Sequence, residues 1–192
     1  PLARLLREAG PPLPVVASVL ACALDGLHAA HELVDETGRP LGVVHRDASP
    51  HNVLVTRHGD VKVLDFGVAK AASASTRTLS GVVKGKTTYM APEQAMRGAV
   101  DRRADLFVIG IVLWEALAGR RLWGDLPEHE ALGEVVRARI PAPSSSRAHG
   151  EPSLEDVCMK ALARAPEDRF ASAAEMASAL RGAIAERPCP PS

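Results

Sequence analysis

The stretch His45-Arg46-Asp47-Ala48-Ser49-Pro50-His51-Asn52, followed further along by Asp65-Phe66-Gly67, decides the fold of this chain. The first segment sets a carboxylate, Asp47, and an amide, Asn52, five residues apart between short apolar runs. A carboxylate in such a loop can orient a hydroxyl group and accept its proton, while an amide oxygen can bind a hard cation. Asp65 follows another apolar run and precedes a glycine, so its carboxylate is suited to a Mg²⁺ ion that bridges phosphates.

Short β-like runs surround these polar segments. They are Val43-Val44, Val53-Leu54-Val55 and Val61-Lys62-Val63-Leu64. The last two flank Arg57-His58-Gly59-Asp60, which has the composition of a hairpin turn. The sequence therefore predicts a small β region that carries its most polar motifs.

Most of the remaining chain has helical periodicity. The expected helices run from Leu2 to Ala9, Pro14 to Asp35, Asp105 to Ala118 and Glu128 to Arg139, with two more beginning at the capping boxes Ser153–Asp156 and Ser172–Glu175. The apolar stripe of the second helix has one gap, at His31. The helix from Asp105 is apolar nearly all round, so we expect it to be fully buried. The fold class is therefore α+β and mostly helical, in one domain.

Composition narrows the classes of function. The 192 residues include 23 Lys and Arg and 23 Asp and Glu, so the formal net charge is zero. This balance argues against a nucleic-acid binder and against a polybasic membrane-surface segment. We expect no membrane helix, because the longest apolar run, Phe107 to Trp114, falls short of about 20 residues. The three cysteines form no disulfide or metal pattern and no signal peptide opens the chain, which favours the cytoplasm.

A third motif, Ala91-Pro92-Glu93, closes a Ser/Thr-rich stretch that begins near Ala71. With the three motifs in this order, the chain resembles the C-terminal lobe of a eukaryotic-type (Hanks-type) protein kinase, most like the bacterial serine/threonine kinases. The resemblance covers about Pro1 to Ala185. It implies a protein-kinase-like C-lobe with a small β-hairpin region at the catalytic loop. We expect this partial kinase domain to span residues 1–187, with a Pro-rich tail or linker at 188–192.

The resemblance implies the chemistry of the site. Asp47 is the expected catalytic base, and the reaction is transfer of the γ-phosphate of ATP to Ser or Thr hydroxyls of protein substrates. Asn52 and Asp65 are the expected ligands of Mg²⁺ (or Mn²⁺), and Leu54 is expected to lie against the adenine ring. Arg46 is expected to meet a phosphorylated residue of the activation loop.

Other residues are implied to be structural. His45 and Phe66 are expected to hold the turn that ends at Gly67. Glu93 and Arg169 are expected to form a buried ion pair that anchors the activation segment. Asp105 is expected to hold the backbone of the catalytic loop, which is compatible with a simple helix N-cap.

Two departures from the family pattern are linked in one hypothesis. Serine/threonine kinases usually carry Lys two residues after the catalytic Asp, and this chain has Ser49 there. After Gly85 the family usually has Thr, and this chain has Lys86. Lys86 is hypothesised to supply the missing positive charge; the alternative is a solvated surface lysine.

The Ser/Thr-rich stretch also predicts regulation. With Arg46 present, we expect phosphorylation at Thr76, Thr78 or Ser80. Thr87 and Thr88 are closer to the substrate-docking turn, and one of them could serve in docking instead.

The sequence contains no Gly-rich phosphate loop, no Val-Ala-Ile-Lys strand and no partner Glu. We therefore expect that the N-lobe is absent from this chain, that its partners are protein substrates and an N-lobe or regulatory domains, and that the chain alone has little activity. Two alternatives stay open. One is an isolated C-lobe that acts as a non-catalytic, pseudokinase-like binding module. The other is a phosphotransferase for small molecules, which the Ala-Pro-Glu segment argues against.

Overall fold

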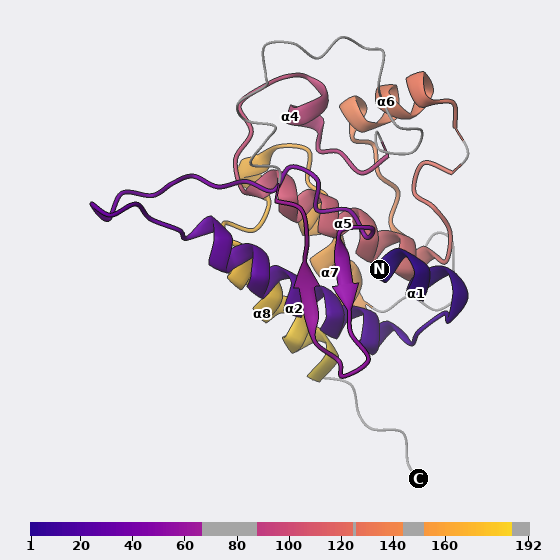
Figure 1. The fold of residues 1–192 in the computed structure, drawn as a ribbon. Coiled ribbons are helices and arrows are strands. Elements are labelled where there is room, and N and C mark those ends of the chain that lie inside the picture. The colour runs from indigo at the N-terminus through magenta and orange to yellow at the C-terminus, as the bar shows by residue number, and fades with distance from the viewer. Residues whose placement is uncertain (67–87, 125, 144–151, 186–192) are drawn as a thin grey trace.

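The structure is a computed structural model that describes residues 1–66, 88–124, 126–143 and 152–185 (Figure 1). The helical body consists of α2 (Leu13–His31), α5 (Arg103–Ala118), α7 (Pro152–Ala161) and α8 (Ala173–Ala185). A two-stranded hairpin, β1 (Val53–Val55) and β2 (Val61–Val63), packs against α2. Shorter helices complete the fold: α1 (Leu2–Glu8), α4 (Pro92–Ala95), α6 (Glu128–Arg137) and the 3₁₀ turn η2 (Pro166–Asp168). The prediction of a mostly helical fold with a small β region is confirmed.

Helix α5 is the centre of the core, as its nearly continuous apolar sequence predicts. Phe107, Ile109, Leu113 and Trp114 lie on different faces of the helix and are all fully buried. Gly110 allows α7 to approach, because a Cβ built there would lie 3.0 Å from the Cβ of Ala161. The helix ends at Gly119, whose φ of 69° suits glycine.

The hairpin forms as predicted, antiparallel, with Val53 opposite Val63 and Val55 opposite Val61. Its turn includes Gly59 at φ 90°, a conformation that glycine adopts without steric cost. Val53 is buried against the core, and Leu54, next along the strand, is only partly buried. Alternation along a strand therefore puts Leu54 on the outer face of the hairpin.

The strand expected at Val43-Val44 is wrong. Those residues have no ladder partner among the residues that the structure describes. The next two backbone N–H groups, of His45 and Arg46, donate to the carboxylate of Asp105. A side chain of α5 therefore holds the backbone that directly follows this pair.

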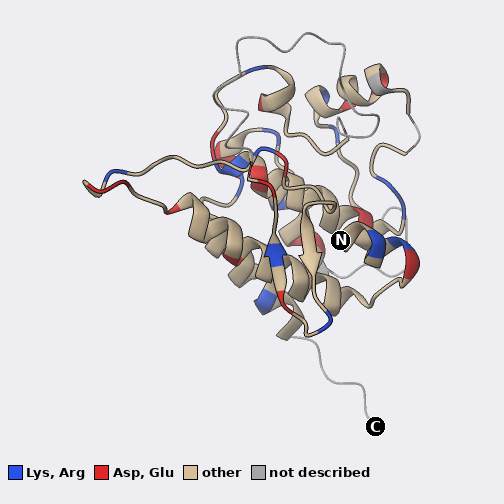
Figure 2. Ribbon diagram, in the orientation of Figure 1, with Lys and Arg blue, Asp and Glu red and all other residues tan. Residues whose placement is uncertain are grey.

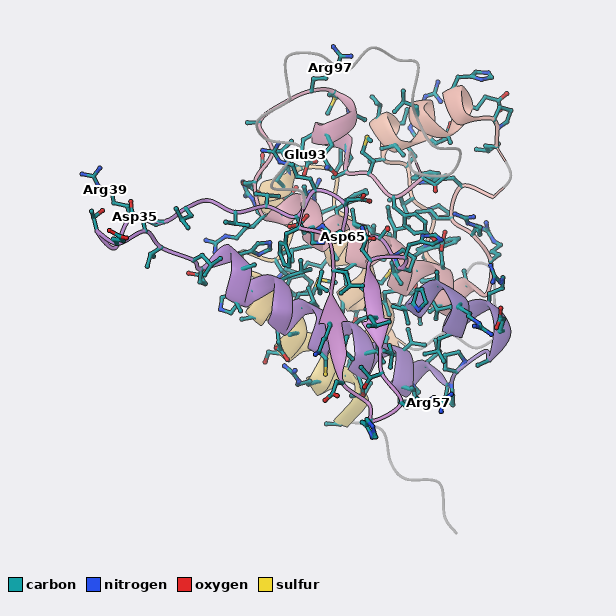
Figure 3. All side chains as sticks on the ribbon, in the orientation of Figure 1. Asp35, Arg39, Arg57, Asp65, Glu93 and Arg97 are labelled. Atoms are coloured by element: carbon teal, nitrogen blue, oxygen red, sulfur yellow. The ribbon has the colours of Figure 1, made fainter. Side chains whose placement is uncertain are left out.

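Helix α2 ends at His31, four residues before the predicted end at Asp35. The chain then forms a projecting arm, residues 32–42, closed by an isolated bridge between Val34 and Pro40. Figure 3 labels Asp35 and Arg39 at the tip of this arm. The Asp35 carboxylate accepts hydrogen bonds from the hydroxyl of Thr37 and from the N–H groups of Thr37 and Arg39, and these lower its pKa. Such side-chain bonds to the backbone compete with the helix and end it early.

Helix α2 is also long and apolar enough to span a membrane, judged by length and composition alone. The expectation of no membrane helix considered only uninterrupted apolar runs and so passed over α2. In the structure its apolar face, which includes Leu20, Leu24 and Leu27, is buried in the core. The helix packs against α5, α8 and the hairpin.

The C-terminal helices begin beside their predicted capping boxes. At α8, the N–H of Glu175 donates to the Ser172 hydroxyl over 3.1 Å. The Glu175 carboxylate in turn accepts the N–H of Ala171 over 2.9 Å. Helix α6 ends at Arg137, two residues before the predicted Arg139, because Ala138 adopts the left-handed conformation at φ 46°. The expected tail at 188–192 lies outside the described residues.

Candidate active site

Asp105 fixes the backbone of the loop that carries Asp47. It lies in the first turn of α5, fully buried, with one carboxylate oxygen 2.9 Å from the N–H of His45 and the other 2.8 Å from the N–H of Arg46. Arg46 has a φ of 64°, which is unfavourable for a residue with a Cβ. The carboxylate thus holds a strained backbone in place, a feature that recurs at functional sites. Because it faces the loop, Asp105 does not act as the N-cap of α5, a position that Arg102 occupies.

His31 is a site residue that sequence reasoning missed. Its Nε2 lies 2.8 Å from the same Asp105 carboxylate, and both side chains are fully buried. Its Nδ1 has no hydrogen-bond partner within the part of the chain that the structure describes. The available signal was the gap in the apolar stripe of α2, since a polar side chain on a buried face requires a partner.

His45 joins the loop to the Asp65 turn. Its Nδ1 accepts the N–H of Asp47 over 3.2 Å, so Nε2 carries the proton and donates to the carbonyl of Leu64 over 2.8 Å. The imidazole also packs against the ring of Phe66, with 4.6 Å between centroids. His45 therefore ties the backbone on both sides of the site to one buried ring.

Asn52 and Asp65 lie at the same end of the hairpin. The backbone N–H of Leu64 donates to the carbonyl of Asn52 over 2.8 Å, which brings Asp65 next to the Asn52 strand end. Figure 3 shows Asp65 at the hairpin end near α5, away from Arg57 in the turn. Asn52 Nδ2 donates to the carbonyl of Asp47 over 2.8 Å, so its amide oxygen is the atom that can bind a cation. The two side chains fit a hard cation with oxygen ligands.

Few protein ligands are available for that cation. No group of three or more His, Cys, Asp and Glu side chains converges anywhere in the described ranges. Mg²⁺ commonly binds through one or two protein oxygens and completes its shell with water and substrate phosphates. One Asp and one Asn match this way of binding Mg²⁺.

A buried ion pair anchors the segment around Ala-Pro-Glu. Arg169 donates to the two carboxylate oxygens of Glu93 over 2.7 and 2.9 Å. Its remaining N–H groups reach the carbonyls of Ala163, Arg103 and Arg164 over 2.8, 3.1 and 3.0 Å. All of the polar atoms that burial removes from water are thus hydrogen-bonded, which buried charges require. Helix α4 also reaches the loop directly, since Gln94 Nε2 donates to the carbonyl of Arg46 over 3.1 Å.

Tyr89 and Glu115 form a second contact that sequence reasoning missed. The Tyr89 hydroxyl donates to Glu115 over 2.6 Å, and the N–H of Leu122 donates to the other carboxylate oxygen over 3.2 Å. Burial, with the Glu115 charge as a second cause, raises the pKa of Tyr89. The signal was that the only tyrosine of the chain stands two residues before Ala-Pro-Glu.

Several predicted residues cannot be placed. Gly67, Lys86 and the expected phosphosites Thr76, Thr78, Ser80 and Thr87 lie outside the described residues. Thr88 is half-buried, with its hydroxyl 3.4 Å from the Arg121 guanidinium. Ser49, at the position where the family usually has Lys, is buried, whereas the side chain of Arg46 is exposed.

Comparisons with known proteins find relatives along most of the chain. The sequence family described as "Protein kinase domain" matches residues 6–180. The tyrosine-protein kinase MasK of Myxococcus xanthus (strain DK1622) is 47% identical over 175 residues, 91% of this chain and 27% of MasK. The serine/threonine-protein kinase Pkn1 of Myxococcus xanthus is 42% identical over 180 residues, 89% of this chain and 24% of Pkn1.

The serine/threonine-protein kinase PknL of Mycobacterium tuberculosis is 36% identical over 186 residues, 96% of this chain and 44% of PknL. The chain therefore spans less than half the length of each of these relatives. The crystal structure of the Mycobacterium tuberculosis PknI kinase domain has a TM-score of 0.64 at 26% identity, over 90% of this chain and 56% of that one.

Proposed function

The chain belongs to the protein kinase domain family, and from this premise we propose that it forms the C-lobe of a serine/threonine kinase that transfers the γ-phosphate of ATP to proteins. The observation that carries the proposal is the position of Asp47, Asn52 and Asp65 around one end of the hairpin. Their backbone is held by two buried side chains, Asp105 and His45. Pre-organised groups of this kind are what phosphoryl transfer requires.

In the proposed mechanism Asp47 acts on the acceptor. Its carboxylate accepts a hydrogen bond from the substrate hydroxyl and orients the oxygen toward the γ-phosphorus. As the new O–P bond forms, Asp47 takes the hydroxyl proton. The hydrogen bond from its own N–H to His45 and the one from Asn52 to its carbonyl fix the backbone at Asp47.

Asn52 and Asp65 are the proposed ligands of Mg²⁺ or Mn²⁺. When bound, the ion neutralises charge that develops on the β- and γ-phosphate oxygens. Leu54, on the outer face of β1, is proposed to provide an apolar surface for the adenine ring.

We propose that activity also needs an N-lobe. The sequence contains no Gly-rich loop motif and no strand Lys motif of the kinase type, and those parts hold the α- and β-phosphates in this family. Cytoplasmic ATP and protein substrates would then be the partners of the assembled site.

Serine or threonine is proposed as the acceptor, although the names of the relatives differ. MasK is named a tyrosine kinase, whereas Pkn1 and PknL are named serine/threonine kinases. The segment Thr87-Thr88-Tyr89-Met90-Ala91-Pro92-Glu93 resembles the bacterial serine/threonine group and supports this choice.

Lys86 and the loop phosphosites remain part of the proposal. The Lys86 ammonium would approach the γ-phosphate in place of the Lys missing at Ser49. The exposed guanidinium of Arg46 would bind a phosphate on Thr76, Thr78 or Ser80, and Thr87 or Thr88 would contact the substrate.

A non-catalytic binding module is the second candidate, favoured by the lack of a Gly-rich loop in the sequence. One experiment separates the two candidates. A chain that includes an N-lobe is incubated with radiolabelled ATP, Mg²⁺ and a generic protein substrate, and the labelled amino acid is identified after hydrolysis. Phosphoserine or phosphothreonine supports the proposal, and phosphotyrosine alone corrects the acceptor class. No transfer by the wild type, together with retained partner binding, supports the binding module.

The proposed metal ligands have their own control. Asp65→Asn is expected to lower transfer by at least about 100-fold, because the carboxylate is the stronger ligand of the pair. Arg57→Gln, in the turn at the far end of the same hairpin, is expected to leave transfer unchanged.

A further inference from the structure

A cleft of about 710 Å³ lies directly beside the catalytic loop. Pro50 and His51, which follow Asp47 by three and four residues, form one wall of it. Helix α1 forms another and is fastened to the loop, since the N–H of Ala3 donates to the carbonyl of Pro50 over 2.9 Å. Tyr89 lies at the same wall as His51, with 6.5 Å between the ring centroids. A peptide whose acceptor hydroxyl reaches Asp47 would therefore continue into this cleft.

The charged groups that line the cleft are mostly basic. They are Arg7 from α1 and Arg120 and Arg121 from the segment after α5, against the single acid Glu115. This excess is local, because the chain as a whole has no formal net charge. Figure 2 shows the basic and acidic residues of α1 side by side at the right-hand edge of the molecule.

Glu115 is already used within the protein. Its two carboxylate oxygens accept the Tyr89 hydroxyl and the Leu122 N–H, and Arg121 Nε lies 3.8 Å away. A basic side chain entering the cleft would have to displace these contacts. Glu115 therefore offsets one of the three positive charges, chiefly that of its neighbour Arg121, and the lining keeps a basic excess.

Arg7 and Arg121 can reach such a ligand. The side chain of Arg7 is 75% exposed and its partner Glu8 is itself on the surface, so that pair exchanges readily with a competing carboxylate. Arg121 is 51% exposed, with its guanidinium 5.6 Å from the centre of the Tyr89 ring. Leu6 and Leu13, both partly buried, add apolar side chains to the lining of the cleft.

From this arrangement we infer that the cleft selects acidic substrates: it binds a protein segment in which Asp or Glu stands within about five residues of the acceptor. An extended chain advances about 3.3 to 3.6 Å per residue, so this window covers roughly 17 Å of peptide on either side of the acceptor. The inference rests on the proposed kinase function and names the substrate class of that same site.

The test compares peptides that differ only in charge. Serine peptides carry glutamate, alanine or arginine at positions two to five on either side of the acceptor, and kcat/KM is measured with the N-lobe-containing kinase. On one side of the acceptor, the kcat/KM of the glutamate peptide is expected to exceed that of the alanine peptide by about tenfold. The ratio is expected to fall as salt rises from 0.1 to 1 M, because the Debye length shrinks from about 10 to about 3 Å.

Charge reversal supplies the matched control. Arg7→Glu is expected to lower the glutamate-to-alanine ratio of kcat/KM at least about fivefold, and Arg121→Gln to lower it in the same direction. Arg39→Glu reverses the same charge at the tip of the projecting arm, and Arg39 does not line the cleft, so the ratio is expected to stay unchanged. Equal ratios for Arg7→Glu and Arg39→Glu, or a preference of the wild type for arginine, would overturn the inference.

The experiment distinguishes failure of the proposed kinase function from failure of the proposed acidic-substrate cleft. If no peptide is phosphorylated, the proposed function fails, and binding of the fluorescein-labelled glutamate and alanine peptides to the same protein, measured by anisotropy, still decides the inference. Tighter binding of the glutamate peptide that Arg7→Glu removes supports it. Equal binding of both peptides contradicts it.

Discussion

Asp105 accepts a hydrogen bond of 2.8 Å from the backbone N–H of Arg46, although 59 positions separate the two residues in the sequence. The same buried carboxylate holds His45 and His31. The central helix therefore sets the conformation of the loop that precedes Asp47. Folding of the core and pre-organisation of the candidate site are thus connected through one side chain.

Asp105→Asn tests this connection. The amide keeps the shape but exchanges one acceptor oxygen for a donor that faces N–H groups. We expect a loss of about 1–3 kcal/mol in the free energy of unfolding, from denaturant titration, and a lower kcat in the N-lobe-containing kinase. Asp156→Asn, exposed on α7, should change neither. An Asp105→Asn protein with wild-type stability and kcat would show that the carboxylate does not hold the loop.

Removing one partner of the Glu93–Arg169 pair should be costly. Glu93→Ala leaves the fully buried guanidinium of Arg169 without its carboxylate, so we expect the free energy of unfolding to fall by about 3–5 kcal/mol. The exposed pair of Arg181 and Asp25 is the comparison, and Arg181→Ala should cost less than about 1 kcal/mol. Similar losses for the two variants in urea titrations would argue that burial does not set the strength of the pair.

Tyr89 should make stability depend on alkaline pH. Burial raises its pKa above the ordinary value of 10.0, so the unfolded chain loses the phenolic proton first. The stabilisation that the protonated Tyr89 hydroxyl gives the folded state is therefore fully present below about pH 10. It is lost as the pH rises through the folded-state pKa. The free energy of unfolding of the wild type should exceed that of Tyr89→Phe by about 1–2 kcal/mol at pH 8, and this difference should be smaller at pH 10.5. A difference that grows with pH would contradict this sign.

Two glycines should respond oppositely to alanine. At Gly110 the added Cβ would lie 3.0 Å from Ala161 Cβ and 3.1 Å from Leu162, so overpacking should cost about 1–3 kcal/mol. Gly182, in α8, has nothing within 4 Å of a built Cβ, and Gly182→Ala should gain about 0.5–1 kcal/mol from helix propensity. Thermal unfolding of both variants checks the pair. A stabilised Gly110→Ala protein would mean that α5 and α7 are farther apart than the structure has them.

Local patterns were enough to predict the parts of the fold that local interactions control. The hairpin around Gly59 and the buried helix α5 follow from turn residues and apolar continuity. The end of α2 did not follow, because the side-chain bonds of Asp35 outweigh a periodicity that continues past His31. Val43-Val44 has the β propensity of a strand but no ladder partner among the described residues, and propensity alone does not supply one.

The candidate site shows the same limit. Motif resemblance singled out Asp47, Asn52 and Asp65, whose spacing is short. His31 and Glu115 act through partners 74 and 26 positions away, and no local pattern records such a distance. The fold alone brings those residues to the loop.

The central claim is that this lobe carries the base of a phosphoryl transfer, and the most direct test is the rate of that transfer with Asp47→Asn. In the N-lobe-containing kinase with saturating ATP and Mg²⁺, the account predicts a fall in kcat of about 10²–10⁴-fold, the usual contribution of a positioned acid or base. Asp25→Asn, exposed on α2, should transfer phosphate at the wild-type rate. An Asp47→Asn protein that transfers phosphate as fast as Asp25→Asn would contradict the account.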